Sequence, residues 1–172
     1  MNTSHEYKTA GIIGPGEGLC TDELYSFGHK LGSLLAQQNM SMVCGGLGGF
    51  MQAACEGFQQ SPGHKTGKAI GILPGEEASA ANPYVDIAIP TGMGIARNIL
   101  IIRTADIIIA AGGGAGTLSE LAFAWQLHKK VLCLTQFEGW TKKLAGNDLD
   151  SRHEGLLIPV NNLHDISENL GW

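Results

Sequence analysis

The chain has 172 residues, the length of one ordinary domain, and we expect a single domain over residues 1–172. Hydrophobic residues make up 44% and charged residues 16% of it, which excludes a disordered or fibrous protein. The net charge of −5 comes without a basic stripe, which excludes a nucleic-acid surface. No apolar run approaches the roughly 18 residues of a membrane span, so we expect no membrane partner.

The cysteines and the N-terminal residues indicate a cytoplasmic protein. Four cysteines at positions 20, 44, 55 and 133 show no C-x-x-C spacing, and we expect them to be reduced thiols, mostly packed in the core. Residues 1–11 contain no apolar stretch of the kind that a signal peptide needs. We therefore expect a cytoplasmic location.

The first half of the chain alternates short apolar runs with segments of helical periodicity. Thr21 is suited to cap the first helix, and Asp22 and Glu23 complement the positive end of that helix. The elements predicted here are, in order, a strand over 9–13, a helix from 21 to 35, a strand over 40–44, a helix through 51–58, a loop over 59–68, and strands over 69–73 and 85–90.

In the second half, Gly92 and Gly94 introduce a predicted helix over 96–103. Residues 106–111 form the most apolar run of the sequence, which predicts a central strand buried on both faces. The remaining predicted elements are a helix over 117–128, a strand over 131–134, a loop over 138–154, a strand over 156–160 and a short terminal helix capped by Asn162.

This alternation of strands and helices with short turns predicts the fold class. Repeated βα units require parallel strands with right-handed crossovers. We therefore expect an α/β domain with a single doubly wound, mainly parallel sheet of the Rossmann-like kind, with helices on both faces.

Glycine is the outlier in the composition. Its 25 residues are about twice the usual share of roughly 7%, and eleven of them cluster in three short turns at 14–18, 45–49 and 112–116. In a doubly wound sheet, ligands bind outside the carboxyl ends of the strands, where glycine lets a phosphate approach backbone N–H groups at helix N-termini. The turns therefore predict a crevice for a phosphate-bearing small molecule, with tight turns that bind no ligand as the alternative.

The residues of these turns do not match the sequence motifs of the common nucleotide-binding enzymes. The first turn reads G-P-G-E-G, so Leu19 stands where a dinucleotide fingerprint has its third glycine, and residues 43–45 carry no acid for a ribose. No G-K-[ST] follows any turn, and no His or Cys pair has ligand spacing. We expect neither NAD nor a metal held by protein side chains.

Two charged residues close to the glycine turns are candidates for chemistry. Arg97 opens the helix that follows Gly92 and Gly94, where a guanidinium can clamp a phosphate, although a surface salt bridge is the alternative. Glu120 follows Thr117 at the spacing T-x-x-E, which also suits a capping box at a helix start. Both roles for Glu120 stay open.

Residues 113–120 read GGAGTLSE and resemble the GGxGTxxE motif of the Lonely guy family, phosphoribohydrolases that activate cytokinins and were formerly mislabelled lysine decarboxylases. Residues 45–51 are similar to that family's GGxxGLM turn. Arg97 stands sixteen residues before Gly113, the offset of the family's catalytic arginine, and Asp106 falls on the family's acidic position. The resemblance covers about residues 10–135 and implies a Rossmann-like fold, Arg97 and Glu120 as catalytic residues, and a dimeric or higher assembly.

The sequence departs from the enzymes of this family at three places. Gly112 replaces the proline before the glycine pair, Asn98 replaces the lysine after the arginine, and the first turn carries G-P-G. With the runs 71–75 and 90–98, these features resemble a sister branch that includes the molybdenum cofactor carrier proteins. Molybdenum cofactor is a pterin that carries a phosphate and holds its own metal through a dithiolene.

The resemblance implies two alternative functions. The first is a carrier or storage protein for molybdenum cofactor, with molybdenum enzymes as acceptors. The second is a nucleoside 5'-monophosphate phosphoribohydrolase, in which Arg97 orients the nucleotide and Glu120 activates water. The predicted ligand- and phosphate-binding residues are Gly14, Pro15, Gly16, Gly45, Gly46, Gly49, Met51, Gly92, Arg97, Gly113, Gly114, Ala115, Gly116, Thr117 and Glu120.

The predicted helix over 117–128 is apolar on more than one face. One face covers the sheet, and the second must be buried by another surface. We expect a symmetry mate to bury it in a homo-oligomer, a dimer or tetramer, with cover by the tail over 138–172 as the alternative.

Overall fold

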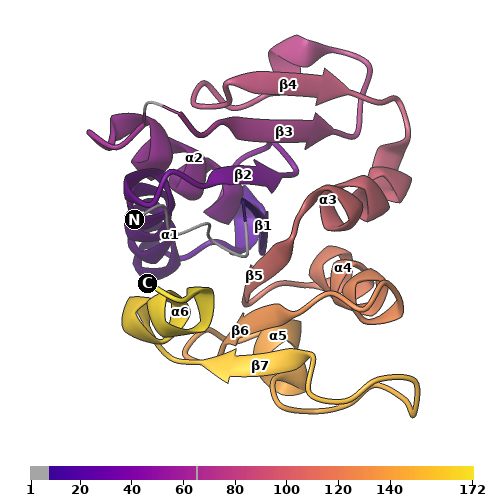
Figure 1. Cartoon of the computed structure of the whole chain (residues 1–172). Coiled ribbons are helices and arrows are strands. Elements are labelled where there is room, and N and C mark those ends of the chain that lie inside the picture. Colours follow the sequence, from indigo (N-terminus) through magenta and orange to yellow (C-terminus); the bar gives the residue numbers. More distant parts are fainter. Residues whose placement is uncertain (1–7, 65) are drawn as a thin grey trace.

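The computed structural model describes residues 8–64 and 66–172 (Figure 1). Most of the N-terminal stretch in which we expect no signal peptide, residues 1–7 of 1–11, therefore lies outside the described residues. Within the described chain, seven strands form one sheet in the order β4-β3-β2-β1-β5-β6-β7, and every neighbouring pair is parallel. The predicted α/β fold with a parallel sheet is confirmed.

Six of the seven strands lie within one residue of the bounds predicted from the apolar runs. The exception is β4, which begins two residues later than expected. The strands are β1 (Thr9–Ile13), β2 (Ser41–Cys44), β3 (Ala69–Leu73), β4 (Ile87–Pro90), β5 (Ile107–Ala111), β6 (Val131–Leu134) and β7 (Leu157–Val160). The helices are α1 (Asp22–Gln37), α2 (Phe50–Gln60), α3 (Asn98–Thr104), α4 (Ala115–Gln126), α5 (Trp140–Leu144) and α6 (Leu163–Leu170), with 3₁₀ turns η1 (Glu17–Leu19), η2 (Ala78–Ala80) and η3 (Gly94–Arg97).

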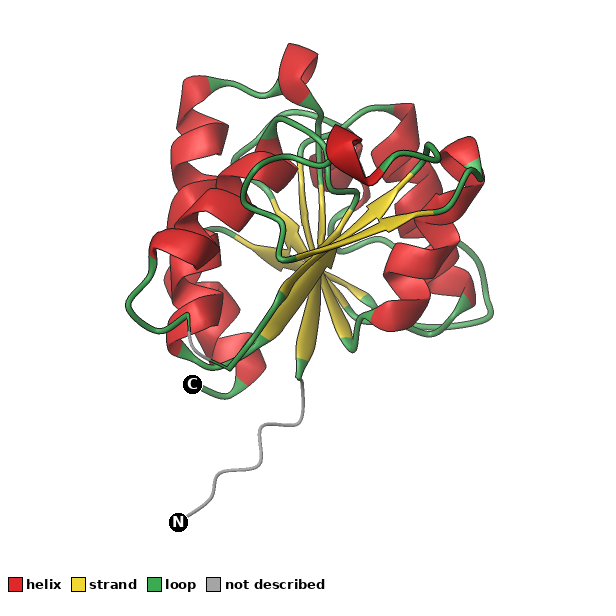
Figure 2. Ribbon diagram, turned by 90° about the horizontal axis from the view of Figure 1, so that it is seen from above, coloured by secondary structure: helices red, strands yellow, loops and turns green. Residues whose placement is uncertain are grey.

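Helices cover both faces of the sheet (Figure 2). Buried side chains of α1, α2 and α6 pack on one face, and those of α3 and α4 pack on the other. β5 lies between β1 and β6, and all five of its residues are buried, as the sequence predicts for a central strand. The parallel pairing brings the carboxyl ends of all the strands to one edge of the sheet, which is where the glycine turns lie.

Three helices differ from the sequence expectation. The expected loop over 138–154 contains α5, which docks on the third glycine turn, because the N–H groups of Trp140 and Thr141 donate to the carbonyls of Gly113 and Gly112 at 3.0 Å. α4 begins at Ala115, two residues before the expected start. The helix expected from residue 96 is a 3₁₀ turn up to Arg97, and α3 begins after it.

The close packing of α1 on α2 depends on two glycines. A Cβ atom at Gly32 of α1 would overlap the carbonyl of Ala54, and a Cβ at Gly57 of α2 would overlap the carbonyl of His29. The backbones of the two helices therefore approach one another more closely than larger residues would allow. This contact packs two helices against the strands that lead to the first two glycine turns.

We expect Gly32→Ala to lower the free energy of unfolding by about 3 kcal/mol or more, because the added methyl must push the two backbones apart. Urea denaturation followed by circular dichroism measures the change. Gly75→Ala is the matched control, since a Cβ there meets no atom within 4 Å, and it should change stability by less than about 0.5 kcal/mol. Equal losses in the two variants would contradict this account.

Candidate functional site

A cavity of about 380 Å³ lies at the carboxyl ends of the central strands. Its walls come from the turns that follow β1, β2, β3, β4 and β5. Ten of the residues that the sequence proposed for binding line it: Gly14, Pro15, Gly16, Met51, Arg97, Gly114, Ala115, Gly116, Thr117 and Glu120. The first and third glycine turns thus supply backbone to the cavity, and the second reaches it through Leu47 and Met51.

The other five proposed residues, Gly45, Gly46, Gly49, Gly92 and Gly113, do not line the cavity. Gly45 lies behind it, where a Cβ atom would overlap Nη2 of Arg97. A Cβ at Gly49 would overlap the backbone of the first turn, and one at Gly113 would overlap Thr117. Gly45, Gly49 and Gly113 therefore leave the space that Arg97, the first turn and Thr117 occupy.

Six lining residues were not among those the sequence proposed: Leu19, Leu47, Pro74, Gly94, Ile95 and Asn98. Leu19 and Ile95 are exposed by 71% and 89%, the largest exposures among the described bulky apolar side chains. No local signal in the sequence distinguishes these two residues from apolar residues of an ordinary turn. Asn98 could have been found as the residue that replaces the family's lysine.

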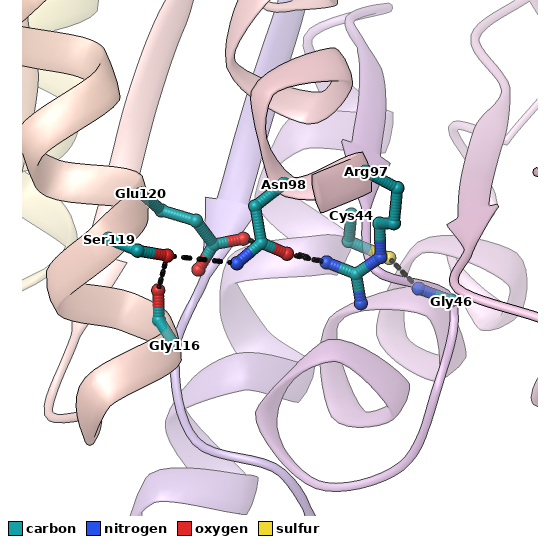
Figure 3. Close-up of polar contacts among 7 residues, drawn as sticks. All are labelled: Cys44, Gly46, Arg97, Asn98, Gly116, Ser119 and Glu120. Atoms are coloured by element: carbon teal, nitrogen blue, oxygen red, sulfur yellow. Dashed lines mark hydrogen bonds and ion pairs between the residues drawn. The ribbon is translucent and has the colours of Figure 1, made fainter. Parts of the chain in front are cut away.

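Arg97 is the cation of the site and is only 8% exposed. It stands at the end of η3, where its Nη1 donates a hydrogen bond to Oδ1 of Asn98 and lies 3.9 Å from Oε1 of Glu120 (Figure 3). Its Nε is buried, and no described group accepts its hydrogen bond. Desolvation lowers the pKa of Arg97, and the Glu120 carboxylate opposes that shift. A buried donor without an acceptor suits an anion.

Glu120 is buried as well, with 7% of its surface exposed. Burial raises the pKa of Glu120 to about 7, although the charge of Arg97 pulls it down. The prediction of a capping box formed by Thr117 and Glu120 is wrong. The N-cap of α4 is Gly114, which has no side chain to form a capping hydrogen bond, and Thr117 lies inside the first turn of the helix. The helix starts earlier because the glycine turn itself provides the N-cap. Glu120 is therefore free to face the cavity.

A chain of hydrogen bonds ties Arg97 to the first turn of α4. Asn98 accepts from Arg97 and donates through Nδ2 to Oγ of Ser119 at 3.1 Å, and Ser119 donates to the carbonyl of Gly116 at 2.7 Å. Figure 3 shows these groups in a row between α3 and α4. The relay fixes the arginine relative to the helix end that lines the other side of the cavity.

The N-terminus of α4 is the second feature that favours an anion. Ala115, Gly116 and Thr117, the first three residues of a helix of 12 residues, line the cavity. The first N–H groups of a helix have no partner within it and carry the positive end of its dipole. Together with Arg97, this geometry can hold one phosphate group.

The cysteines of β2 and α2 lie below this cavity. Cys44 Sγ accepts a hydrogen bond from the N–H of Gly46 at 3.4 Å and lies 3.7 Å from Sγ of Cys55. Both thiols are fully buried, and all four cysteines are free. The hydrogen bond from Cys55 lowers the pKa of Cys44. Neither residue lines the cavity.

The model of the SLOG cluster4 family matches residues 7–165, which is most of the chain. The chain belongs to the SLOG cluster4 family. It is 40% identical over 124 residues to an uncharacterised protein of Archaeoglobus fulgidus, a match that covers 72% of this chain and 78% of that protein. This membership confirms the resemblance on which the sequence interpretation rests.

Two solved structures of similar fold are named for molybdenum cofactor. The molybdenum cofactor binding protein from Rippkaea orientalis is 30% identical, with a TM-score of 0.82 and 98% of each chain covered. The molybdenum cofactor carrier protein of Chlamydomonas reinhardtii is 25% identical, with a TM-score of 0.80 and coverage of 95% and 96%. The chain is therefore similar over nearly its whole length to proteins of the carrier branch.

Residues 8–64 and 66–172 contain no group of three or more His, Cys, Asp or Glu side chains placed to hold a metal ion. In the same part of the chain, no helix has the length and apolar character needed to cross a bilayer.

The raised pKa of Glu120 predicts a pH-dependent stability. The folded protein keeps the proton of Glu120 up to a pH of about 7, whereas the unfolded chain loses it near 4.5, so stability falls as the pH rises through this window. Relative to Glu120→Gln, the wild type should lose about 2–3 kcal/mol of unfolding free energy between pH 5 and pH 8.

Urea denaturation at several pH values measures this difference. Glu77→Gln is the matched control, because Glu77 is exposed in the turn before η2 and should leave the pH dependence of the wild type unchanged. Parallel pH profiles for the wild type and Glu120→Gln would show that Glu120 ionises normally in the folded state.

Proposed function

We propose that this protein binds a phosphate-bearing small molecule, molybdenum cofactor, and acts as its carrier or storage protein in the cytoplasm. The observation that carries the proposal is the buried Arg97, which faces a cavity lined by the N-terminus of α4 and has a buried N–H without a partner. The similarity to the cofactor-binding proteins of Rippkaea and Chlamydomonas supports the choice of cofactor.

The residues of the cavity fit this ligand. Arg97 and the N–H groups of residues 115–117 would hold the phosphate. Apolar side chains, among them Leu19, Met51 and Ile95, would cover the flat pterin. Among the described lining residues there is no His or Cys, which suits a cargo that brings its own dithiolene ligands to the metal.

One observation favours the alternative, a nucleoside 5'-monophosphate phosphoribohydrolase. Glu120 faces the same cavity as Arg97, lies 3.9 Å from it and has a pKa of about 7. A carboxyl group with such a pKa can take up or release a proton near neutral pH, as a general base or acid requires. Arg97 would orient the nucleotide in that case.

Two assays on the same protein separate the functions. A carrier should protect added molybdenum cofactor, measured by reconstitution of a molybdenum enzyme that lacks it, and should release no base from a panel of nucleoside monophosphates. Glu120→Gln should keep most of the protection, because binding needs no general base. Steady release of free base by the wild type that is lost in Glu120→Gln would overturn the carrier in favour of the hydrolase.

The role of Arg97 is testable with any phosphate-bearing ligand. Arg97→Ala should weaken binding about ten- to a hundredfold, because a buried charged hydrogen bond is worth roughly 1.5–3 kcal/mol. Arg103→Ala is the matched control, since Arg103 is exposed on α3 and does not line the cavity. Isothermal titration calorimetry measures both, and equal affinities would remove Arg97 from the site.

We also propose that the protein is a homo-oligomer, a dimer or tetramer. The tail covers part of α4, because Trp125 donates to Asp150 at 2.9 Å and packs on His153. Leu118 and Phe123 of α4 stay half-buried, and Ile87 and Ile89 of the edge strand β4 are exposed. A second copy would cover these side chains.

Light scattering at micromolar concentration tests this assembly, with a dimeric or larger mass expected and a monomeric mass as the contrary result. The other partners in the proposal are molybdenum enzymes that accept the cofactor. Nucleic acid is not among them, because Arg97 is the single cation among the described lining residues, and a phosphate backbone needs several.

A further inference from the structure

Arg97 and Glu120 are the only titratable residues among the described side chains that line the cavity. They come from different elements, η3 and α4, and Nη1 of the arginine lies 3.9 Å from Oε1 of the glutamate. Both side chains are almost fully removed from solvent. The charge that a ligand meets in this cavity is therefore set by two groups.

The structure gives the Glu120 carboxylate little support apart from Arg97. None of the hydrogen bonds found in the described chain ends on Glu120, although Asn98 and Ser119 lie close by and bond to one another instead (Figure 3). In a site of low polarity, a carboxylate without hydrogen bonds stays ionised only through its neighbouring cation.

An anion that binds to Arg97 changes this balance. The anion pairs with the guanidinium that otherwise compensates the charge of the Glu120 carboxylate. It also adds negative charge to the same cavity. Two negative charges within one buried cavity repel one another strongly. The repulsion raises the proton affinity of the group that can accept a proton. Sulfate stays a dianion near neutral pH and cannot take up this proton, whereas the Glu120 carboxylate can.

We propose that a dianionic phosphomonoester binds at Arg97 together with one proton taken up by Glu120, so that the site holds its ligand more tightly as the pH falls. This inference rests on the proposed function, because it requires an anion site at Arg97. It assigns Glu120 the role of setting the affinity of the carrier for its ligand.

Other titratable groups near Glu120 do not replace it in this role. Cys44 of β2 also interacts electrostatically with Arg97 and Glu120. Its thiol is buried, does not line the cavity, and is hydrogen-bonded to the thiol of Cys55 and to the N–H of Gly46. The elements packed around Glu120 contribute only uncharged polar side chains to the cavity, Thr117 from its own helix and Asn98 from α3. No histidine is among the described lining residues.

The experiment uses sulfate, which stays dianionic between pH 5.5 and 8.5, so that any pH dependence belongs to the protein. Calorimetric titration of the wild type in two buffers of different ionisation enthalpy counts the protons taken up on binding. We expect up to one proton per site at pH 8, and an affinity that falls by up to about tenfold per pH unit above pH 7.

Glu120→Gln should bind sulfate with a flat pH profile at the affinity that the wild type reaches at low pH, and should take up no proton. Cys44→Ala should keep the pH dependence of the wild type. Inorganic phosphate, titrated in parallel, should show the same difference between the wild type and Glu120→Gln on top of its own ionisation. The proton count of the wild type remains decisive if Glu120→Gln fails to fold.

The failures of the two proposals are distinct. If sulfate and phosphate bind the wild type without proton uptake, or with the same pH dependence as Glu120→Gln, the coupling is wrong and the anion site stands. If neither anion binds the wild type at any pH, the anion site at Arg97 is wrong, and the proposed function and the coupling fall together.

Discussion

The burial of one positive charge governs the architecture of the site. An ion removed from water costs several kcal/mol unless charges and hydrogen bonds compensate it, and the guanidinium of Arg97 has one hydrogen bond to a side chain, that of Asn98, and one ion pair, with Glu120, among the described residues. The glycine at position 45 leaves the space that the guanidinium occupies. The parallel sheet, the turn η3 and the start of α4 together hold a cation that is compensated incompletely, and an anionic ligand would complete the compensation.

Much of the fold follows from the sequence, because its strongest signals are local and repeated. Six strands lie where apolar runs place them, and β5 is buried on both faces as its five apolar residues require. The short helix α5 could not be predicted, since residues 138–154 show no helical period. Its position comes from backbone hydrogen bonds to the turn at Gly112 and Gly113, which are distant in sequence.

The candidate site was predicted less completely than the fold. Composition and spacing single out Arg97, Glu120 and the first and third glycine turns, and the cavity is lined by both side chains and by residues 14–16 and 114–116 of those turns. The spacing of Thr117 and Glu120 also suggested a helix cap, and the structure excludes it, because Gly114 begins the helix earlier. Leu19 and Ile95 escaped prediction because nothing local tells an exposed apolar residue at a cavity mouth from one in an ordinary turn.

The docking of α5 occupies two hydrogen-bond acceptors of the third glycine turn. The carbonyls of Gly112 and Gly113 accept hydrogen bonds from the N–H groups of Thr141 and Trp140, so α5 engages these two acceptors, while the residues that follow, 114–116, line the cavity. None of residues 138–154 lines the cavity, so this segment supports the turn without forming a wall of the site. Insertions or deletions within residues 138–154 would then act on the site from outside it, by leaving these two carbonyls without their donors.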